Sequence, residues 1–274
     1  MRILGVDFTS RPGPRKPIVV AVARAASRIV HVESIRRIET FAAFEDRLRE
    51  DGPWIGGFDF PFGLPRAFVD ARLPARDWAD LVERVAAMSR DEFCAITWDA
   101  FRAAKGRPDL KHREVDSRAG SHSPLKTMDP VRRHAVNPPV GLMFYEGTPR
   151  LLRAGVDIPG LHRTAADRVA LEAYPGWVAR GLGERWYKND EPRHGRSRIE
   201  ARGRIVAALA AGSWMRMRVR IAPEDVDAVL EDAGGDRLDA VMCVALAAFA
   251  ARQPGFGVPP DVDPVEGWVA GVPR

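Results

Sequence analysis

Five acidic side chains stand in apolar or helix-opening contexts, where an ionised carboxylate is unusual. Asp7 ends the apolar run RILGVDF, Asp59 lies in GGFDFPFG, and Glu172 lies in RVALEAYP. Asp236 and Asp239 open the apolar stretch GDRLDAVMCVALAAFAA. A carboxylate in apolar surroundings is costly unless it is paired or binds a metal ion. We therefore take these five residues as the candidate catalytic set, and the four aspartates among them as candidate ligands of a hard divalent cation such as Mg²⁺ or Mn²⁺.

Each of these acids also has an ordinary explanation. Asp7 and Asp59 could cap a helix or shape a turn after their strands, and Glu172 could cap a strand edge or pair with an arginine. Asp236 lies where a helix N-terminus stabilises negative charge through its free amides and dipole. Asp239 shares a helix face with Asp236, so the two carboxylates repel each other unless a cation lies between them. A divalent ion would relieve that repulsion.

The elements that must position these acids follow an α/β order. Apolar patterns predict strands at 2–8, 18–25, 28–39, 54–60 and 168–175, and helices at 40–50, 196–211, 222–232 and 235–251. The first part therefore has the order β-β-β-α-β. This order places one acid near the end of the first strand and another near the end of the fourth.

Residues 66–166 interrupt this order and look like an insertion or a cap. They hold two helical patterns, DWADLVERVAAM and DEFCAITWDAFRAA, and then a polar stretch. Between Arg102 and His134, nine Lys or Arg residues accompany four Asp or Glu residues, an excess of five positive charges that equals the net charge of the chain. This stretch is either a solvated loop or an arm that contacts phosphate. The candidate nucleic-acid contacts are Lys105, Arg107, Lys111, Arg113, Lys126, Arg132 and Arg133.

The composition argues against several other classes of protein. The 274 residues are 46% hydrophobic and 29% charged, as is typical of a globular protein. Cys94 and Cys243 lie in apolar helical patterns, which predicts buried thiols and neither a disulfide nor a cysteine zinc site. The six histidines have no HExxH spacing, and no P-loop or GxGxxG fingerprint is present. No apolar run of about 18 residues and no leader pattern is found, so we expect a cytoplasmic protein without a membrane partner.

The order of the acids along the β-β-β-α-β pattern resembles the RNase H-like superfamily. There, a mixed sheet carries an Asp on its first strand, an acid at the end of its fourth, and further acids on a late helix. The motifs GVDFTS, GGFDFPFGLP, EAYP, GGDRLDA and EGWV also resemble a family of unknown function whose members are predicted RNase H-fold nucleases. They span residues 5–268. The resemblance implies a mixed five-stranded sheet flanked by helices, built from residues 1–65 and 167–274, with a mainly helical insertion at 66–166.

The same resemblance implies hydrolysis of nucleic-acid phosphodiester bonds by two Mg²⁺ or Mn²⁺ ions about 4 Å apart. Asp7 would bridge the ions, Asp59 and Asp239 would each bind one, and Asp236 or Glu172 would complete the shell. Two other functions stay open. One is a nucleic-acid or nucleotide-binding protein of the same fold that does not cleave. The other is a phosphotransferase of the actin-like branch, for which TSRPGPRKP is a poor version of the glycine-rich phosphate turn.

Overall fold

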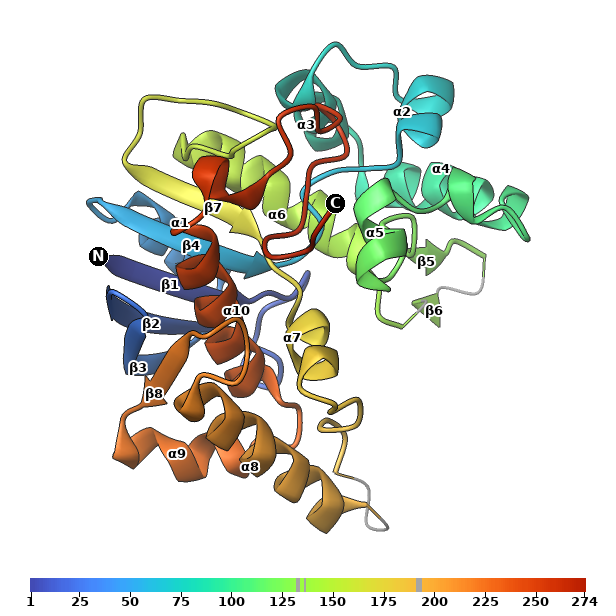
Figure 1. The fold of residues 1–274 in the computed structure, drawn as a ribbon. Coiled ribbons are helices and arrows are strands. Elements are labelled where there is room, and N and C mark those ends of the chain that lie inside the picture. The colour runs from blue at the N-terminus through green and yellow to red at the C-terminus, as the bar shows by residue number, and fades with distance from the viewer. Residues whose placement is uncertain (132–133, 136, 191–193) are drawn as a thin grey trace.

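A six-stranded mixed sheet forms the centre of the protein (Figure 1). The computed structural model describes residues 1–131, 134–135, 137–190 and 194–274. The strands are β1 (Arg2–Asp7), β2 (Ile18–Ala26), β3 (Ile29–Ile38), β4 (Trp54–Asp59), β7 (Arg168–Glu172) and β8 (Arg218–Ile221). They lie in the order β7-β4-β1-β2-β3-β8. Strand β2 is antiparallel to β1 and β3, whereas β4 is parallel to β1, β7 to β4, and β8 to β3.

The sheet has one strand more than the five predicted. Strand β8 extends it beyond β3, where Ile29 pairs with Arg218. It has only four residues, RVRI, of which Val219 alone is buried, so its apolar pattern was too short to recognise. A separate antiparallel pair joins β5 (Met128–Asp129) to β6 (His134–Ala135). Strand β7 ends at Glu172, earlier than predicted, because Pro175 begins a helix.

Helix α10 (Asp236–Ala250) covers one face of the sheet (Figure 1). Its side chains are apolar nearly all round, as expected of a helix buried on all sides. The helices that pack in the same core are α7 (Pro175–Gly181), α8 (Gly195–Ala211) and α9 (Pro223–Leu230). Cys243 of α10 is buried and free, and so is Cys94, which confirms the prediction of two buried thiols. No helix among the described residues is both long and apolar enough to cross a membrane.

The opposite face of the sheet packs on helices from both the predicted core and the predicted insertion. Leu4 and Val6 of β1 share a core with Phe44 of α1 (Phe41–Arg49) and Leu151 of α6 (Val140–Ala154). Parallel strands need a crossover connection, and residues 66–166 lie within the one that joins β4 to β7. The other elements of that connection are α2 (Arg66–Arg72), α3 (Trp78–Ala87), α4 (Arg90–Ala103), η1 (Pro108–Leu110) and α5 (Glu114–Ala119). A short 3-10 turn, η2 (Pro254–Gly257), follows α10.

Two glycines let α10 lie directly on the sheet backbone. Gly5 and Gly57 are register partners on the parallel strands β1 and β4. A Cβ at Gly5 would lie 2.0 Å from the carbonyl oxygen of Ala240, and a Cβ at Gly57 would lie 2.6 Å from that of Cys243. Both distances are below normal contact, so any side chain at these positions would push the helix away from the strands.

We predict that Gly5→Ala destabilises the protein. The methyl group meets backbone atoms of α10, which cannot rotate away, so the loss should be at least about 1–3 kcal/mol. Gly203→Ala in α8 is the matched control, because a Cβ there meets nothing within 4 Å and alanine favours a helix by about 0.5–1 kcal/mol. Urea unfolding of both variants checks this. Equal stability of Gly5→Ala and the wild type would contradict the close packing.

Candidate metal centre

Three carboxylates meet where β1 and β4 end beneath the start of α10. Asp7 and Asp59 are register partners at the ends of these parallel strands, two residues after the paired glycines. Asp239 lies in the first turn of α10. One oxygen from each of the three lies within 4.8 Å of the others. Asp7 is 5% exposed and Asp239 is 0% exposed, whereas Asp59 is partly exposed. The structure thus brings together three of the four predicted metal ligands.

The three carboxylates strongly disfavour each other's negative charge. Burial, with repulsion from Asp239 and Asp236, raises the pKa of Asp7 well above its usual value. Burial and the nearby Asp239 raise the pKa of Asp59 to about 8. Burial also raises the pKa of Asp239, although Lys188 and Tyr187 oppose this. Such mutual repulsion is what a bound divalent cation would relieve.

The donor atoms suit a hard divalent cation. The Oδ2 atom of Asp7 is buried and has no hydrogen-bond partner among the described residues, which is costly for a carboxylate oxygen unless a ligand completes its surroundings. Every donor in the cluster is a carboxylate oxygen, the type that Mg²⁺ and Mn²⁺ prefer. Oxygens on opposite sides of Mg²⁺ are about 4.2 Å apart, so only small side-chain shifts separate this arrangement from ligation.

The fourth predicted ligand, Asp236, pairs with a lysine. The Nζ atom of Lys16 lies 2.6 Å from Oδ1 of Asp236. Among the described residues, the cluster of converging oxygens comprises Asp7, Asp59 and Asp239 but not Asp236. The negative charge of Asp236 still raises the pKa of Asp7. The structure leaves it beside the cluster as a charged neighbour.

Three residues around the cluster were not predicted from the sequence. Lys16 lies in the turn between β1 and β2, and Tyr187 and Lys188 lie in the connection between α7 and α8. The Tyr187 hydroxyl donates to Oδ1 of Asp239 at 2.8 Å, and the Lys188 ammonium donates to Oδ2 of the same carboxylate. These segments have no periodic pattern, and no local signal in the sequence marks the three side chains.

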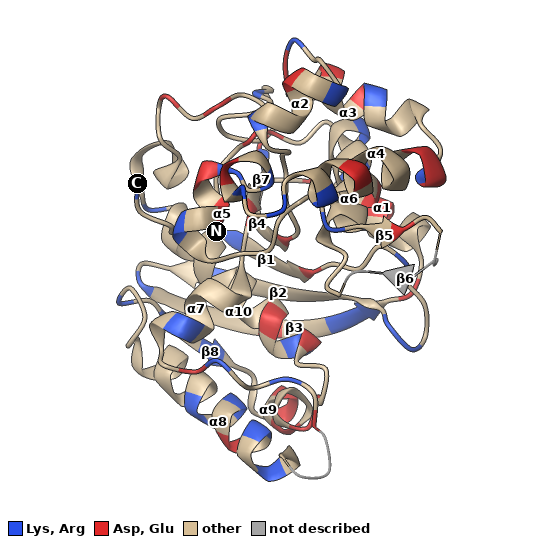
Figure 2. Cartoon of the chain, turned by 90° about the vertical axis from the view of Figure 1, so that its right-hand side faces the viewer, with Lys and Arg blue, Asp and Glu red and all other residues tan. Residues whose placement is uncertain are grey.

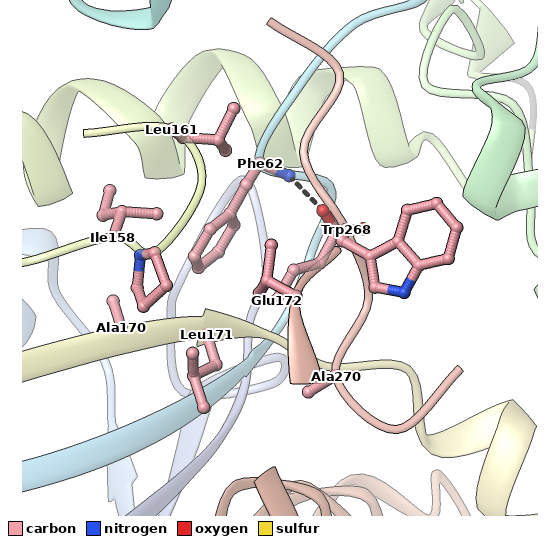
Figure 3. A pocket seen from close by; sticks show the side chains of 10 residues that line it. Phe62, Ile158, Leu161, Ala170, Leu171, Glu172, Trp268 and Ala270 are labelled. Atoms are coloured by element: carbon pink, nitrogen blue, oxygen red, sulfur yellow. Dashed lines mark hydrogen bonds between the residues drawn. The ribbon is translucent and has the colours of Figure 1, made fainter. Parts of the chain in front are cut away.

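Glu172 lies outside the cluster, in an ion pair. The Nη1 and Nη2 atoms of Arg113 donate to its two carboxylate oxygens at 2.7 and 2.6 Å, and Arg113 also binds Asp116. The backbone amide of Phe62 donates to Oε2 of Glu172 at 2.9 Å, beside a mainly apolar pocket that Trp268 helps to line (Figure 3). Glu172 was considered as a metal-shell residue, as a strand-edge cap or as a partner of an arginine. In the structure it pairs with an arginine, Arg113.

The basic stretch divides into exposed and buried members. Arg113 is 2% exposed and forms ion pairs with two carboxylates. It is therefore not available to nucleic acid, and the expectation that it contacts nucleic acid is wrong. Lys105 and Arg107 are exposed, and Arg107 pairs with Asp109. The ammonium of Lys111 lies 5.3 Å from the Phe101 ring centroid, and Lys126 donates to the carbonyl of Asn137 at 3.0 Å. The last two candidates, Arg132 and Arg133, lie outside the described residues.

Basic residues are not confined to this stretch. Figure 2 shows Lys and Arg positions along α8 and on α2 as well. The charge pattern alone therefore does not single out one face of the protein for a polyanion.

A cavity opens beside Asp59 and joins the cluster to the crossover connection. Asp59 and Pro61 line it from the end of β4, and Tyr174 lines it from the segment after β7. The crossover contributes Ser121, His122 and Val140 to its wall, and the ion-paired side chains of Arg113, Asp116 and Glu172 also line it. A group bound in this cavity would lie next to the least buried of the three clustered carboxylates.

Fold and site together define an α/β protein with a buried carboxylate cluster suited to a divalent cation. Comparisons of the chain with protein-family models, curated proteins and solved structures find no match. The function is therefore inferred from the geometry of the site, and membership of the RNase H-like superfamily stays a prediction.

We predict that Asp59→Asn stabilises the metal-free protein at pH 8. The pKa of Asp59 is about 8 in the folded state and about 3.9 when unfolded, so the folded state binds more protons between these values. Rising pH therefore lowers the stability of the wild type across this range. The melting temperature of the variant in chelator should exceed that of the wild type at pH 8, by about 2–4 °C for each kcal/mol of repulsion removed. The difference in melting temperature between the variant and the wild type should shrink towards pH 5. A difference that does not change with pH would contradict the raised pKa of Asp59.

We predict that Arg113→Met costs about 3–5 kcal/mol of unfolding free energy, because it leaves the carboxylates of Asp116 and Glu172 buried without their cation. Arg118→Met, on the adjacent helix α5, is the control. It breaks an exposed pair with Glu114 and should cost less than about 1 kcal/mol. Chemical denaturation measures both, and similar losses for the two variants would argue against a buried ion-pair network.

Proposed function

We propose that this protein is a divalent-metal-dependent nuclease that hydrolyses phosphodiester bonds in nucleic acid. One observation carries the proposal: oxygens of Asp7, Asp59 and Asp239 converge within 4.8 Å, and a buried oxygen of Asp7 has no hydrogen-bond partner in the part of the chain that the structure describes. An arrangement of this kind is suited to a hard cation and has no evident role in stabilising the fold. Mg²⁺ or Mn²⁺ is the cofactor that fits these donors.

The order of the sheet supports the same proposal. Strands β3-β2-β1-β4-β7 place the first strand at the centre, next to the fourth, with Asp7 and Asp59 side by side. The late helix α10 brings Asp239 to them. This is the placement of acids that the resemblance to the RNase H-like superfamily implies, on a sheet that carries one extra edge strand.

The residues around the site have roles that suit a phosphodiester. Asp7, Asp59 and Asp239 would hold the cation, which would supply activation of water and offset the negative charge on the phosphate oxygens. Tyr187 orients Asp239 through its hydroxyl. Lys16 and Lys188 add positive charge at the rim, which favours an anionic substrate. The cavity beside Asp59 gives one side of the cluster access to that substrate.

We predict that the purified protein cleaves nucleic acid with Mn²⁺ or Mg²⁺ and that Asp7→Asn lowers the rate by at least about 100-fold, since it removes a ligand and its charge. End-labelled single- and double-stranded DNA, RNA and a DNA–RNA hybrid should each be tested with metal and with chelator. Asp46→Asn, at an exposed position on α1, should keep the wild-type rate.

Binding without cleavage of all four substrates would overturn the nuclease proposal. It would favour the non-cleaving binding protein of the same fold. Metal-dependent cleavage that survives Asp7→Asn would show that the carboxylate cluster is not the site of the reaction.

A further inference from the structure

The two sides of the carboxylate cluster differ in what occupies them. On the side of Asp239, the Lys188 ammonium binds Oδ2 and the Tyr187 hydroxyl binds Oδ1, so both oxygens are engaged. On the side of Asp7, none of the residues described in the structure forms a hydrogen bond with the buried Oδ2 atom. The Asp239 side of the cluster therefore already contains the Lys188 ammonium. On the Asp7 side, the described residues supply no hydrogen-bond donor to the buried Oδ2 atom.

Lys188 is held in place by the chain on either side of it. Arg202 of α8, which is fully buried, donates to the carbonyl of Tyr187 at 2.8 Å and forms an ion pair with Asp190. The backbone amide of Asn189 donates to the carbonyl of Ala233 at 2.8 Å. These contacts fix residues 187–190 against the segment before α10. The backbone that carries Lys188 is thus held beside the cluster, where its ammonium pairs with Asp239.

The charges of the cluster match one divalent ion better than two. The carboxylates of Asp7, Asp59, Asp236 and Asp239 carry four negative charges when ionised, and Lys16 and Lys188 contribute two positive charges. The excess of two negative charges equals the charge of a single divalent cation. A second divalent ion would leave the site positive and would place a doubly charged ion against the Lys188 ammonium, where the two cations would repel each other.

We propose that the site binds one divalent cation, between Asp7 and Asp59, and that the Lys188 ammonium takes the place of a second ion beside Asp239. This inference rests on the proposed function and narrows it from two-ion to one-ion chemistry. Lys188 is then a resident cation whose distance to the carboxylates is set by the fold. During phosphodiester hydrolysis it would contribute positive charge that a two-ion site obtains from its second metal.

The test is the number of Mn²⁺ ions bound by the full-length, metal-stripped protein. Equilibrium dialysis counts the ions, and electron paramagnetic resonance distinguishes an isolated Mn²⁺ from two ions coupled at about 4 Å. We expect one ion per chain with an uncoupled spectrum for the wild type. Lys188→Met removes the ammonium, and we expect it to bind two ions with a coupled spectrum.

Two variants control for charge and folding. Lys188→Arg keeps a cation beside Asp239 and should still bind one ion. Arg24→Met, at an exposed position on β2 opposite Arg2, at the far end of β1 from Asp7, should bind one ion as the wild type does. Circular dichroism confirms that each variant is folded before the ions are counted. If Lys188→Met does not fold, Lys188→Gln, which also removes the charge but keeps a polar side chain, takes its place and should bind two ions.

The outcomes separate this inference from the proposed function. Two coupled ions in the wild type would overturn the one-ion inference and leave a metal-dependent nuclease in place. A single ion in a folded Lys188→Met would also overturn it, because the lysine would then not be what excludes the second ion. No ion bound by the wild type would overturn the proposed function itself.

Discussion

The direct contact between the α10 backbone and the sheet is the constraint on which the site depends. Gly5 and Gly57 occupy paired positions, and a Cβ at Gly5 would lie 2.0 Å from a backbone oxygen of α10. Each glycine precedes an aspartate by two residues, the spacing that returns to the same face of a strand. The helix that touches the glycines therefore also approaches Asp7 and Asp59, and its first turn supplies Asp239. The pattern Gly-x-Asp, present on both strands, specifies packing and chemistry together.

Holding three carboxylates together opposes folding, and the surrounding structure must compensate for it. Their pKa values are raised because burial and mutual repulsion disfavour the charged forms. Extensive apolar cores on both faces of the sheet supply the favourable free energy, and the ammonium groups of Lys16 and Lys188 offset part of the repulsion. The clustered carboxylates are unfavourable for folding, whereas the rest of the fold buries apolar side chains. Functional sites are expected where a structure keeps such a locally unfavourable arrangement.

Sequence patterns predicted the parts of the site that lie on regular elements. The three clustered aspartates end apolar strands or open an apolar helix, so a local pattern marks each of them. Lys188 has no such mark, because a long loop carries it to the cluster and tertiary contacts alone hold it there. The pair between Arg113 and Glu172 joins residues 59 positions apart, and only the folded chain shows that this arginine is buried. Strand β8 was missed for a different reason, since its four residues owe their conformation to pairing with β3.

In the proposed function, the residues that would bind the cation lie on different parts of the chain from those that would meet the substrate. The aspartates lie on two central strands and a buried helix, which hold their geometry rigidly. The cavity beside Asp59 instead takes part of its wall from the crossover between β4 and β7, through Ser121 and Val140. Ligands of open α/β sheets bind at the carboxyl ends of parallel strands, where loops can vary without disturbing the strands. Residues 66–166 contribute none of the three clustered carboxylates. In the proposed function, this connection would instead shape the approach to the cluster, which is consistent with its containing none of the motifs on which the resemblance rests.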